Sequence, residues 1–136
     1  MTVYCYLPLY IFCGSHLLCA LFSTAGEDPA EGAEEELSRI VKRIRQVWPD
    51  TRIIIRADGS FCREHLMSWC EGNGIGFIFG LPKNKRLPGI IREDIVDAVV
   101  RPTQTGRSFR IFDDFEYQMV KIWSRPRRVV SKAEHK

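Results

Sequence analysis

The chain has 136 residues and is 45% hydrophobic, so it has room for one domain and enough apolar side chains for a core. Its cysteines are odd in number and form no Cys-x-x-Cys pair, which argues against a disulfide framework and against a zinc site. The formal net charge is +3, but residues 83–136 carry 13 Lys or Arg against 7 Asp or Glu, whereas residues 1–82 are net acidic. Free cysteine is usually buried, so we expect core positions for Cys5, Cys13, Cys19, Cys62 and Cys70.

The first apolar segment runs from Val3 to Phe22. No Lys or Arg precedes it, as a signal peptide would require, and Pro8 and Gly14 interrupt it. We therefore expect two strands, residues 4–12 and 17–22, joined by a turn. A membrane anchor is the alternative interpretation of this segment. Under that interpretation the chain would be a small membrane-anchored protein rather than an intracellular one.

A surface loop and then a helix should follow the second strand. Residues 24–33 are rich in Gly, Ala, Pro and acidic side chains, and acidic residues 34–36 fall in the first helical turn, where they suit the helix dipole. Pro49 should end the helix. Apolar residues recur at helical spacing and predict a buried stripe of Leu37, Ile40, Val41, Ile44 and Val47.

A short aliphatic strand, residues 52–55, leads to Asp58. Its β-branched residues predict a central strand with both faces covered. Asp58 would then leave the sheet at its carboxyl edge, where open α/β sheets bind ligands. An Asp before Gly is also a common turn former whose side chain bonds its own backbone, so a metal ligand and a turn residue both stay open. Residues 62–70 predict a helix, and residues 77–79 predict the next strand.

The second half of the chain is basic. Lys83, Lys85 and Arg86 lie in a predicted loop that either grips phosphate or is simply solvated. Residues 92–100 predict a helix, and residues 108–111 and 118–123 predict a hairpin. Since neutralised phosphates supply most sequence-independent affinity, this half is where a nucleic acid would bind.

A second basic cluster, Arg125, Arg127 and Arg128, follows Trp123, whose ring either stacks on a base or packs across strands. Three acids precede it in a predicted strand or turn. We expect a solvated edge rather than a ligand set for Asp113, Asp114 and Glu116.

Several blocks of sequence recur in the order and at about the spacing of one known family. They are residues 4–14, 52–58, 61–64, 79–81 and 84–87, with weaker matches at 123–125 and 127–134. With these blocks the chain resembles an insertion-sequence transposase with a DDE domain of group 1. Gly59 precedes Ser60 where that family usually has the reverse order, which bears on the turn that presents Asp58.

The resemblance implies an α/β fold in two parts. Residues 1–82 would form a partial ribonuclease H-like catalytic core, a mixed sheet flanked by helices and lacking its first strand. Residues 83–136 would form a basic, β-rich extension, incomplete at its C-terminus. Asp58 matches the second of three catalytic carboxylates, and the other two are expected outside this chain. A sheet that lacks a strand also predicts instability or aggregation.

The implied function is metal-dependent cutting and joining of DNA at the ends of a mobile element, in the bacterial cytoplasm and associated with the nucleoid. The family's cofactor is Mg²⁺ or Mn²⁺, and its full-length members are possible homo-oligomers. Because one Asp binds such an ion feebly, we expect weak or no metal binding, no cleavage, and weak, salt-sensitive DNA binding. A non-catalytic DNA-binding or regulatory remnant of a transposase is the alternative.

Overall fold

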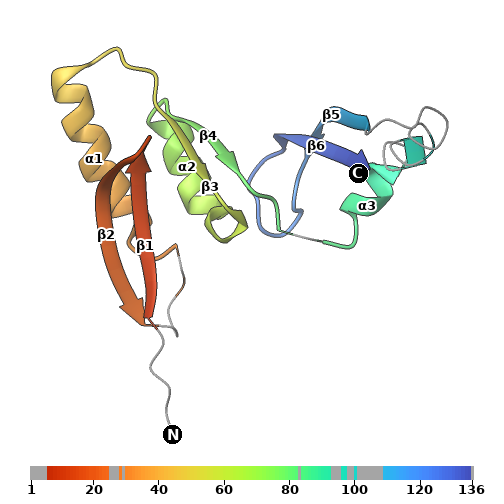
Figure 1. The fold of residues 1–136 in the computed structure, drawn as a ribbon, viewed down its shortest axis with the longest axis horizontal. Coiled ribbons are helices and arrows are strands. Elements are labelled where there is room, and N and C mark those ends of the chain that lie inside the picture. Colours follow the sequence, from red (N-terminus) through yellow and green to blue (C-terminus); the bar gives the residue numbers. More distant parts are fainter. Residues whose placement is uncertain are drawn as a thin grey trace, which may run out of the picture. The chain divides into compact units, whose positions relative to one another are not determined.

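The computed structural model describes residues 6–24, 28, 30–82, 84–92, 96–97, 100 and 109–135. The chain divides into two compact units, Met1–Pro82 and Lys83–Lys136. Within the described residues the protein is mixed α/β, with helices and three two-stranded sheets, as Figure 1 shows.

The first unit begins with the predicted hairpin. Strands β1 (Tyr6–Cys13) and β2 (His16–Thr24) pair antiparallel, with an irregularity in register between Ile11 and Phe12. Gly14 turns the chain with a φ of 59°, a conformation that glycine adopts without steric cost. The hairpin is confirmed, but the core position expected for Cys13 is wrong, because this side chain is exposed. Among the described helices none is long and apolar enough to cross a membrane.

Helix α1 (Ala33–Val47) follows and carries the predicted acidic first turn. Its buried residues are Ala33, Leu37 and Val41, so the stripe is confirmed at its centre. Val47 is 65% exposed, and the prediction that it belongs to the stripe is wrong. The helix ends before Pro49, as expected from the missing N–H and the fixed φ of proline.

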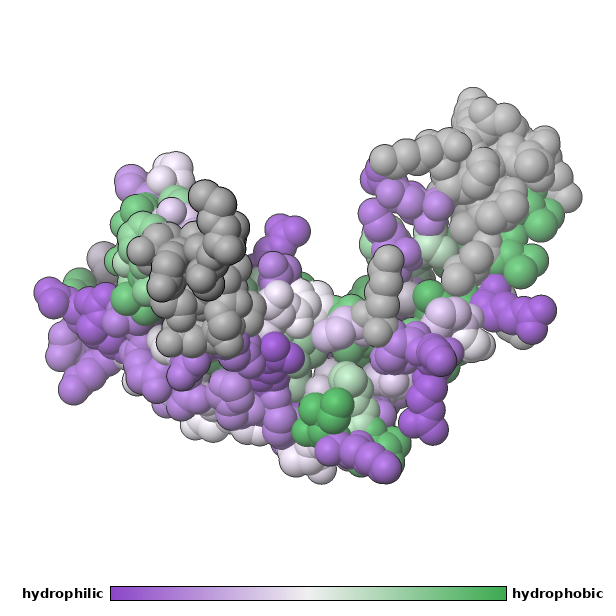
Figure 2. All heavy atoms as spheres, turned by 90° about the horizontal axis from the view of Figure 1, so that it is seen from below, coloured by the Kyte–Doolittle hydropathy of each residue, from purple (hydrophilic) through white to green (hydrophobic). Residues whose placement is uncertain are grey.

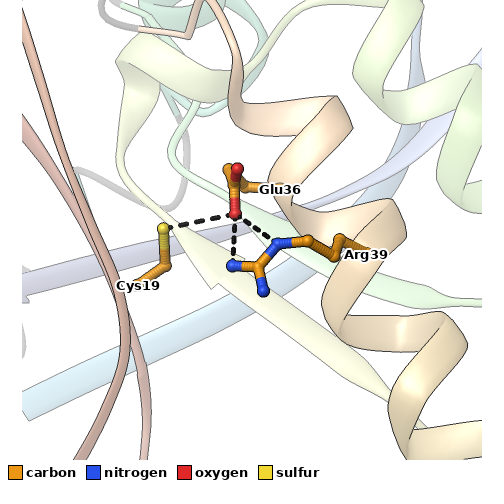
Figure 3. A network of polar contacts seen from close by, with 3 residues as sticks. All are labelled: Cys19, Glu36 and Arg39. Atoms are coloured by element: carbon orange, nitrogen blue, oxygen red, sulfur yellow. Dashed lines mark hydrogen bonds and ion pairs between the residues drawn. The ribbon is translucent and has the colours of Figure 1, made fainter.

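A small polar network joins the hairpin to α1 (Figure 3). The Cys19 thiol donates to Oε2 of Glu36 over 3.4 Å, and Nε and Nη2 of Arg39 donate to the same oxygen over 2.9 and 2.6 Å. Arg39 holds the pKa of the Glu36 carboxyl below its ordinary value. Partial burial, and then the neighbouring Glu36, raise the pKa of the Cys19 thiol. The charged carboxylate thus holds together groups from two separate elements.

A β-α-β unit forms the rest of the first unit. Strands β3 (Ile54–Ala57) and β4 (Gly76–Phe79) pair parallel, and helix α2 (Glu64–Gly72) makes the crossover between them. One face of the pair packs on a buried cluster of Val41, Cys70 and Ile75. The partly buried residues around this cluster are Ile53, Ile55, Trp69, Phe77 and Phe79.

The opposite face of this pair of strands is open in the described residues. Ile54 and Ile78 are 50% and 61% exposed. Side chains alternate between the two faces of a strand, so these residues point away from the buried cluster. The expectation that both faces are covered is therefore wrong, because Ile54 and Ile78 stay at least half exposed on the second face. Hydrophobic residues on the surface are visible in Figure 2.

Cys70 is completely buried at the centre of the cluster, and burial raises the pKa of its thiol to about 11. We expect Cys70 to react with a thiol reagent at pH 8 at least about 100-fold more slowly than a fully exposed thiol, since the thiolate is the reactive form. Mass spectrometry of the labelled sites over time measures both Cys70 and the exposed Cys13. Labelling of Cys70 as fast as Cys13 in the folded protein would contradict the packing described.

The second unit contains a short helix, α3 (Leu87–Ile90), and a hairpin of β5 (Phe109–Tyr117) and β6 (Arg127–His135). Residues 92, 96, 97 and 100 are helical, and the other positions of the helix predicted over 92–100 lie outside the described residues. The strand predicted over 118–123 is wrong. This segment is the turn between β5 and β6, in which the N–H groups of Ile122 and Trp123 bond the carbonyl of Met119.

Candidate functional site

Asp58 immediately follows β3 and is exposed. Its Oδ1 accepts a hydrogen bond from the Ser60 N–H over 2.8 Å, and the residue caps a single 3₁₀ turn, η1 (Gly59–Phe61). The turn interpretation of Asp58 is therefore confirmed. It does not exclude a role as a ligand, because a carboxylate has a second oxygen and several lone pairs.

The carboxyl ends of β3 and β4 are held together beside Asp58. The Gly80 N–H donates to the Ala57 carbonyl over 3.0 Å and continues the pairing of the two strands. A Cβ atom at Gly80 would lie 2.8 Å from the Gly59 nitrogen and 3.2 Å from the Asp58 carbonyl carbon. The turn that presents Asp58 thus rests directly on backbone atoms of the next strand, and only glycine leaves room for this contact.

A metal site of the kind that DNA strand transfer needs is not assembled within the described residues. They contain no group of three or more His, Cys, Asp or Glu side chains able to hold a metal ion. Asp58 supplies one carboxylate, whereas Mg²⁺ prefers six oxygen ligands in near-octahedral geometry. The described part of the chain therefore does not form a complete metal centre.

The acidic cluster of the second unit does not replace the missing ligands. Asp113, Asp114 and Glu116 lie in β5 and are all exposed, which confirms the predicted solvated position. Alternation along the strand places Asp113 on the face opposite the other two. Asp114 also accepts from Nε of Arg128 over 2.6 Å, so its charge is already paired.

The predicted basic loop is partly described. Lys83 lies outside the described residues, whereas Lys85 and Arg86 are exposed. The Asn84 side-chain oxygen accepts from the N–H groups of Arg86 and Leu87 over 3.0 and 3.1 Å, and so orders the start of α3. The sequence interpretation missed this role of Asn84, although an Asn two or three residues before a helix is a recognisable capping signal.

The second basic cluster has three different environments. Arg125 is exposed. Arg127 is only 8% exposed, and its guanidinium carbon lies 5.7 Å from the centre of the Trp123 ring. Arg128 is paired with Asp114. Arg127 is thus enclosed, whereas Arg125 and Arg128 are exposed, and contacts of this cluster with phosphate stay a prediction.

Trp123 itself is 5% exposed, and its ring meets that of Tyr117 edge to face with 6.0 Å between centroids. Of the two interpretations left open for this residue, the packing one is confirmed. Its ring is not available to stack on a base without a rearrangement of the turn.

Comparison with known families decides the assignment. The model of the family described as transposase DDE domain group 1 matches residues 1–136, the whole chain. The chain belongs to this transposase family. Searches of curated proteins and of solved structures gave no match. DDE transposases act on DNA and generally use a divalent metal, and membership of the family supports a transposase-related role.

Two substitutions of Asp58 separate its role as a hydrogen-bond acceptor in the turn of this transposase domain from the role of its negative charge. We expect Asp58→Asn to keep the free energy of unfolding within about 0.5 kcal/mol, because the amide oxygen still accepts from Ser60. Asp58→Ala removes the acceptor and should cost about 1 kcal/mol. Urea unfolding followed by circular dichroism measures both changes. Equal stabilities of the two variants would contradict a structural role for this hydrogen bond.

Proposed function

We propose that this chain is part of the catalytic domain of a DDE transposase with a ribonuclease H-like core, and that Asp58 is one of its catalytic carboxylates. The observation that carries the proposal is the position of Asp58 at the carboxyl end of β3 in a β-α-β unit, in a chain of this family. In open α/β sheets that edge is where ligands bind.

The chain alone is proposed to be inactive. Two-metal cleavage needs several carboxylates around ions roughly 3.5–4 Å apart, and Asp58 contributes one. In the complete family mechanism, Asp58 would hold Mg²⁺ or Mn²⁺ together with acids from outside the described residues. No step of strand cleavage follows from the residues that the structure describes.

DNA binding is the activity proposed to remain. The second unit carries a net charge of +6 by sequence, and its exposed predicted contacts are Lys85, Arg86, Arg125 and Arg128, the last in an exposed ion pair with Asp114. Positive side chains that neutralise phosphates release counterions, and the affinity then falls as salt rises. A regulatory protein derived from a transposase is the second candidate, and the single family carboxylate at the sheet edge favours it over an active enzyme.

The experiment measures the affinity for a duplex DNA by fluorescence anisotropy from about 25 to about 200 mM salt. We expect the double variant Lys85→Ala with Arg86→Ala to bind more weakly, with a slope of log affinity against log salt that is smaller by about 1.8. The control is Lys42→Ala with Arg43→Ala, two exposed residues of α1, which removes the same charge. An equal loss of DNA affinity in both double variants would show that only the net charge matters, and would contradict a specific contact of Lys85 and Arg86 with DNA.

Catalysis is tested in the same preparation with a labelled duplex and Mg²⁺ or Mn²⁺. We expect no strand cleavage by the unaltered chain. Cleavage that disappears in Asp58→Asn would overturn the proposed inactivity and would show that the missing ligands come from another copy or from undescribed residues. DNA binding that is undetectable at the lowest salt would refute the DNA-binding part of the proposal.

A further inference from the structure

The turn between β5 and β6 presents two apolar side chains to water. Val120 and Ile122 are 67% and 58% exposed, and both lie beyond the last pair of the hairpin, Tyr117 with Arg127. We call residues 120–122 the tip of the turn. Isolated apolar residues are ordinary on a protein surface, so the surroundings of the tip decide whether the pair has a role.

The turn is held in one conformation by its own contacts. The Met119 carbonyl accepts from the N–H groups of Ile122 and Trp123 over 2.8 and 2.9 Å. The side-chain amide of Gln118 donates to the Trp123 carbonyl over 2.9 Å. The Trp123 ring is buried against Tyr117 and anchors the turn to the end of β5. The tip is therefore ordered before a partner binds, and little conformational entropy would be lost on binding.

The charge around the tip is positive. No Asp or Glu occurs between Tyr117 and Arg127 in the sequence. Lys121 lies between the two apolar residues, Arg125 follows shortly after them, and both cations are exposed. Such a surface attracts a polyanion. DNA and an anionic membrane are both polyanions, and membership of a transposase family favours DNA.

We propose that the tip is a wedge, in which Val120 and Ile122 insert between two stacked base pairs while Lys121 and Arg125 neutralise the flanking phosphates. Proteins that kink DNA insert apolar side chains into base steps in this way, from the minor groove. The inference rests on the proposed DNA binding and adds the residues that would deform the duplex.

The wedge predicts which DNA is preferred. Insertion requires two neighbouring base pairs to unstack, and this cost is smallest at a mismatched step. The contact needs no hydrogen bond to a base edge, so the preference is for a deformable step rather than for one sequence. Trp123 has no part in the contact, because its ring stays buried.

The experiment compares two short duplexes, one fully paired and one with a single central mismatch. We expect the unaltered chain to bind the mismatched duplex at least about fivefold more tightly at low salt, since the mismatch lowers the cost of unstacking. Fluorescence anisotropy of an end label measures both affinities. An adenine analogue beside the mismatch, whose emission rises when it unstacks, should become brighter on binding.

Two double variants locate the contact. Val120→Ser with Ile122→Ser removes the apolar wedge and keeps both cations, so it should bind the two duplexes equally and leave the emission of the analogue unchanged. The control is Phe112→Ser with Val130→Ser, at residues 64% and 57% exposed in the strands of the same hairpin, and it should keep the preference for the mismatch. Circular dichroism checks that both variants fold, and the comparison of duplexes in the unaltered protein needs no variant.

Four outcomes would overturn the wedge. Equal binding of both duplexes by the unaltered chain would refute it while the proposed DNA binding stands. A preference for the mismatch that survives in Val120→Ser with Ile122→Ser would assign deformation of the duplex to another part of the protein. Binding to phosphatidylserine vesicles that this variant loses, without any preference for the mismatch, would assign the tip to a membrane surface. Undetectable DNA binding would refute the wedge and the proposed DNA binding together.

Discussion

Replacing Leu66 with alanine is expected to lower the free energy of unfolding by about 2–5 kcal/mol, because truncation of a fully buried leucine loses its transfer energy and leaves a cavity. Leu66 is 1% exposed in α2, on the covered side of the β-α-β unit. Domains of this size are stable by about 5–15 kcal/mol, so the loss is a large part of the total. Urea unfolding followed by circular dichroism measures the change.

Ile78→Ala is the matched control, since it removes an aliphatic side chain of similar size from the open face of the same unit. Its side chain is 61% exposed, and we expect a change within about 0.5 kcal/mol. If Ile78→Ala costs as much as Leu66→Ala, the second face of β3 and β4 must be covered in solution, and the asymmetry of the sheet described above is wrong.

Gly80→Ala is expected to destabilise the protein by about 1–3 kcal/mol, the range of an overpacked site. The added Cβ would meet the Gly59 nitrogen at 2.8 Å, and backbone atoms cannot move aside as the end of a flexible side chain can. The turn around Asp58 must therefore shift. The NMR signal of the Ser60 amide, which donates to Asp58, reports this shift separately from the stability measured with urea.

Gly72→Ala provides the control at a glycine with open space around it. A Cβ at Gly72 would meet no described atom within 4 Å beyond its own helix and chain neighbours, and the residue lies at the end of α2. We expect Gly72→Ala to be neutral or stabilising by up to about 1 kcal/mol, because alanine loses less backbone entropy in a helix. A destabilised Gly72→Ala, or an unperturbed Ser60 amide in Gly80→Ala, would count against the close approach of β4 to the turn.

Local signals in the sequence predicted most of the first unit. The hairpin followed from two apolar runs around Gly14, and α1 followed from its 3.6-residue periodicity and its stop at Pro49. Each of these signals involves residues that are close together in the sequence, so it can be recognised without knowledge of the fold. The strand expected over 52–55 lies at Ile54–Ala57 instead, since its bounds depend on where β4 pairs with it.

The second hairpin shows what local signals miss. Residues 118–123 alternate like a strand, yet Val120 and Ile122 are 67% and 58% exposed, and the segment is a turn. The true partner of β5 begins at Arg127 and is rich in charged residues. Its pairing is supported by cross-strand ion pairs such as Arg110 with Glu134 at 3.0 Å, which exist only once the register is set.

The candidate site was predictable only in part, because some of its features depend on local sequence and others on contacts between distant segments. Asp58 follows an aliphatic strand, and this arrangement alone placed it at the carboxyl edge of the sheet. The importance of Gly80 was not visible, because its contact with Gly59 arises from the parallel register of two strands that a helix separates. The burial of Arg127 against Trp123 likewise depends on the fold of the turn, and an arginine-rich sequence is more often exposed.

The three tryptophans lie in three different surroundings, so their intrinsic fluorescence can report on different parts of the protein. Trp48 at the end of α1 is 61% exposed, Trp69 packs against the cluster of the first unit, and Trp123 is buried in the second unit. Iodide should therefore quench the emission of Trp48 first, and single-tryptophan variants would report each unit separately during denaturation. Whether the two halves lose structure together or one before the other then becomes a question of fluorescence spectroscopy.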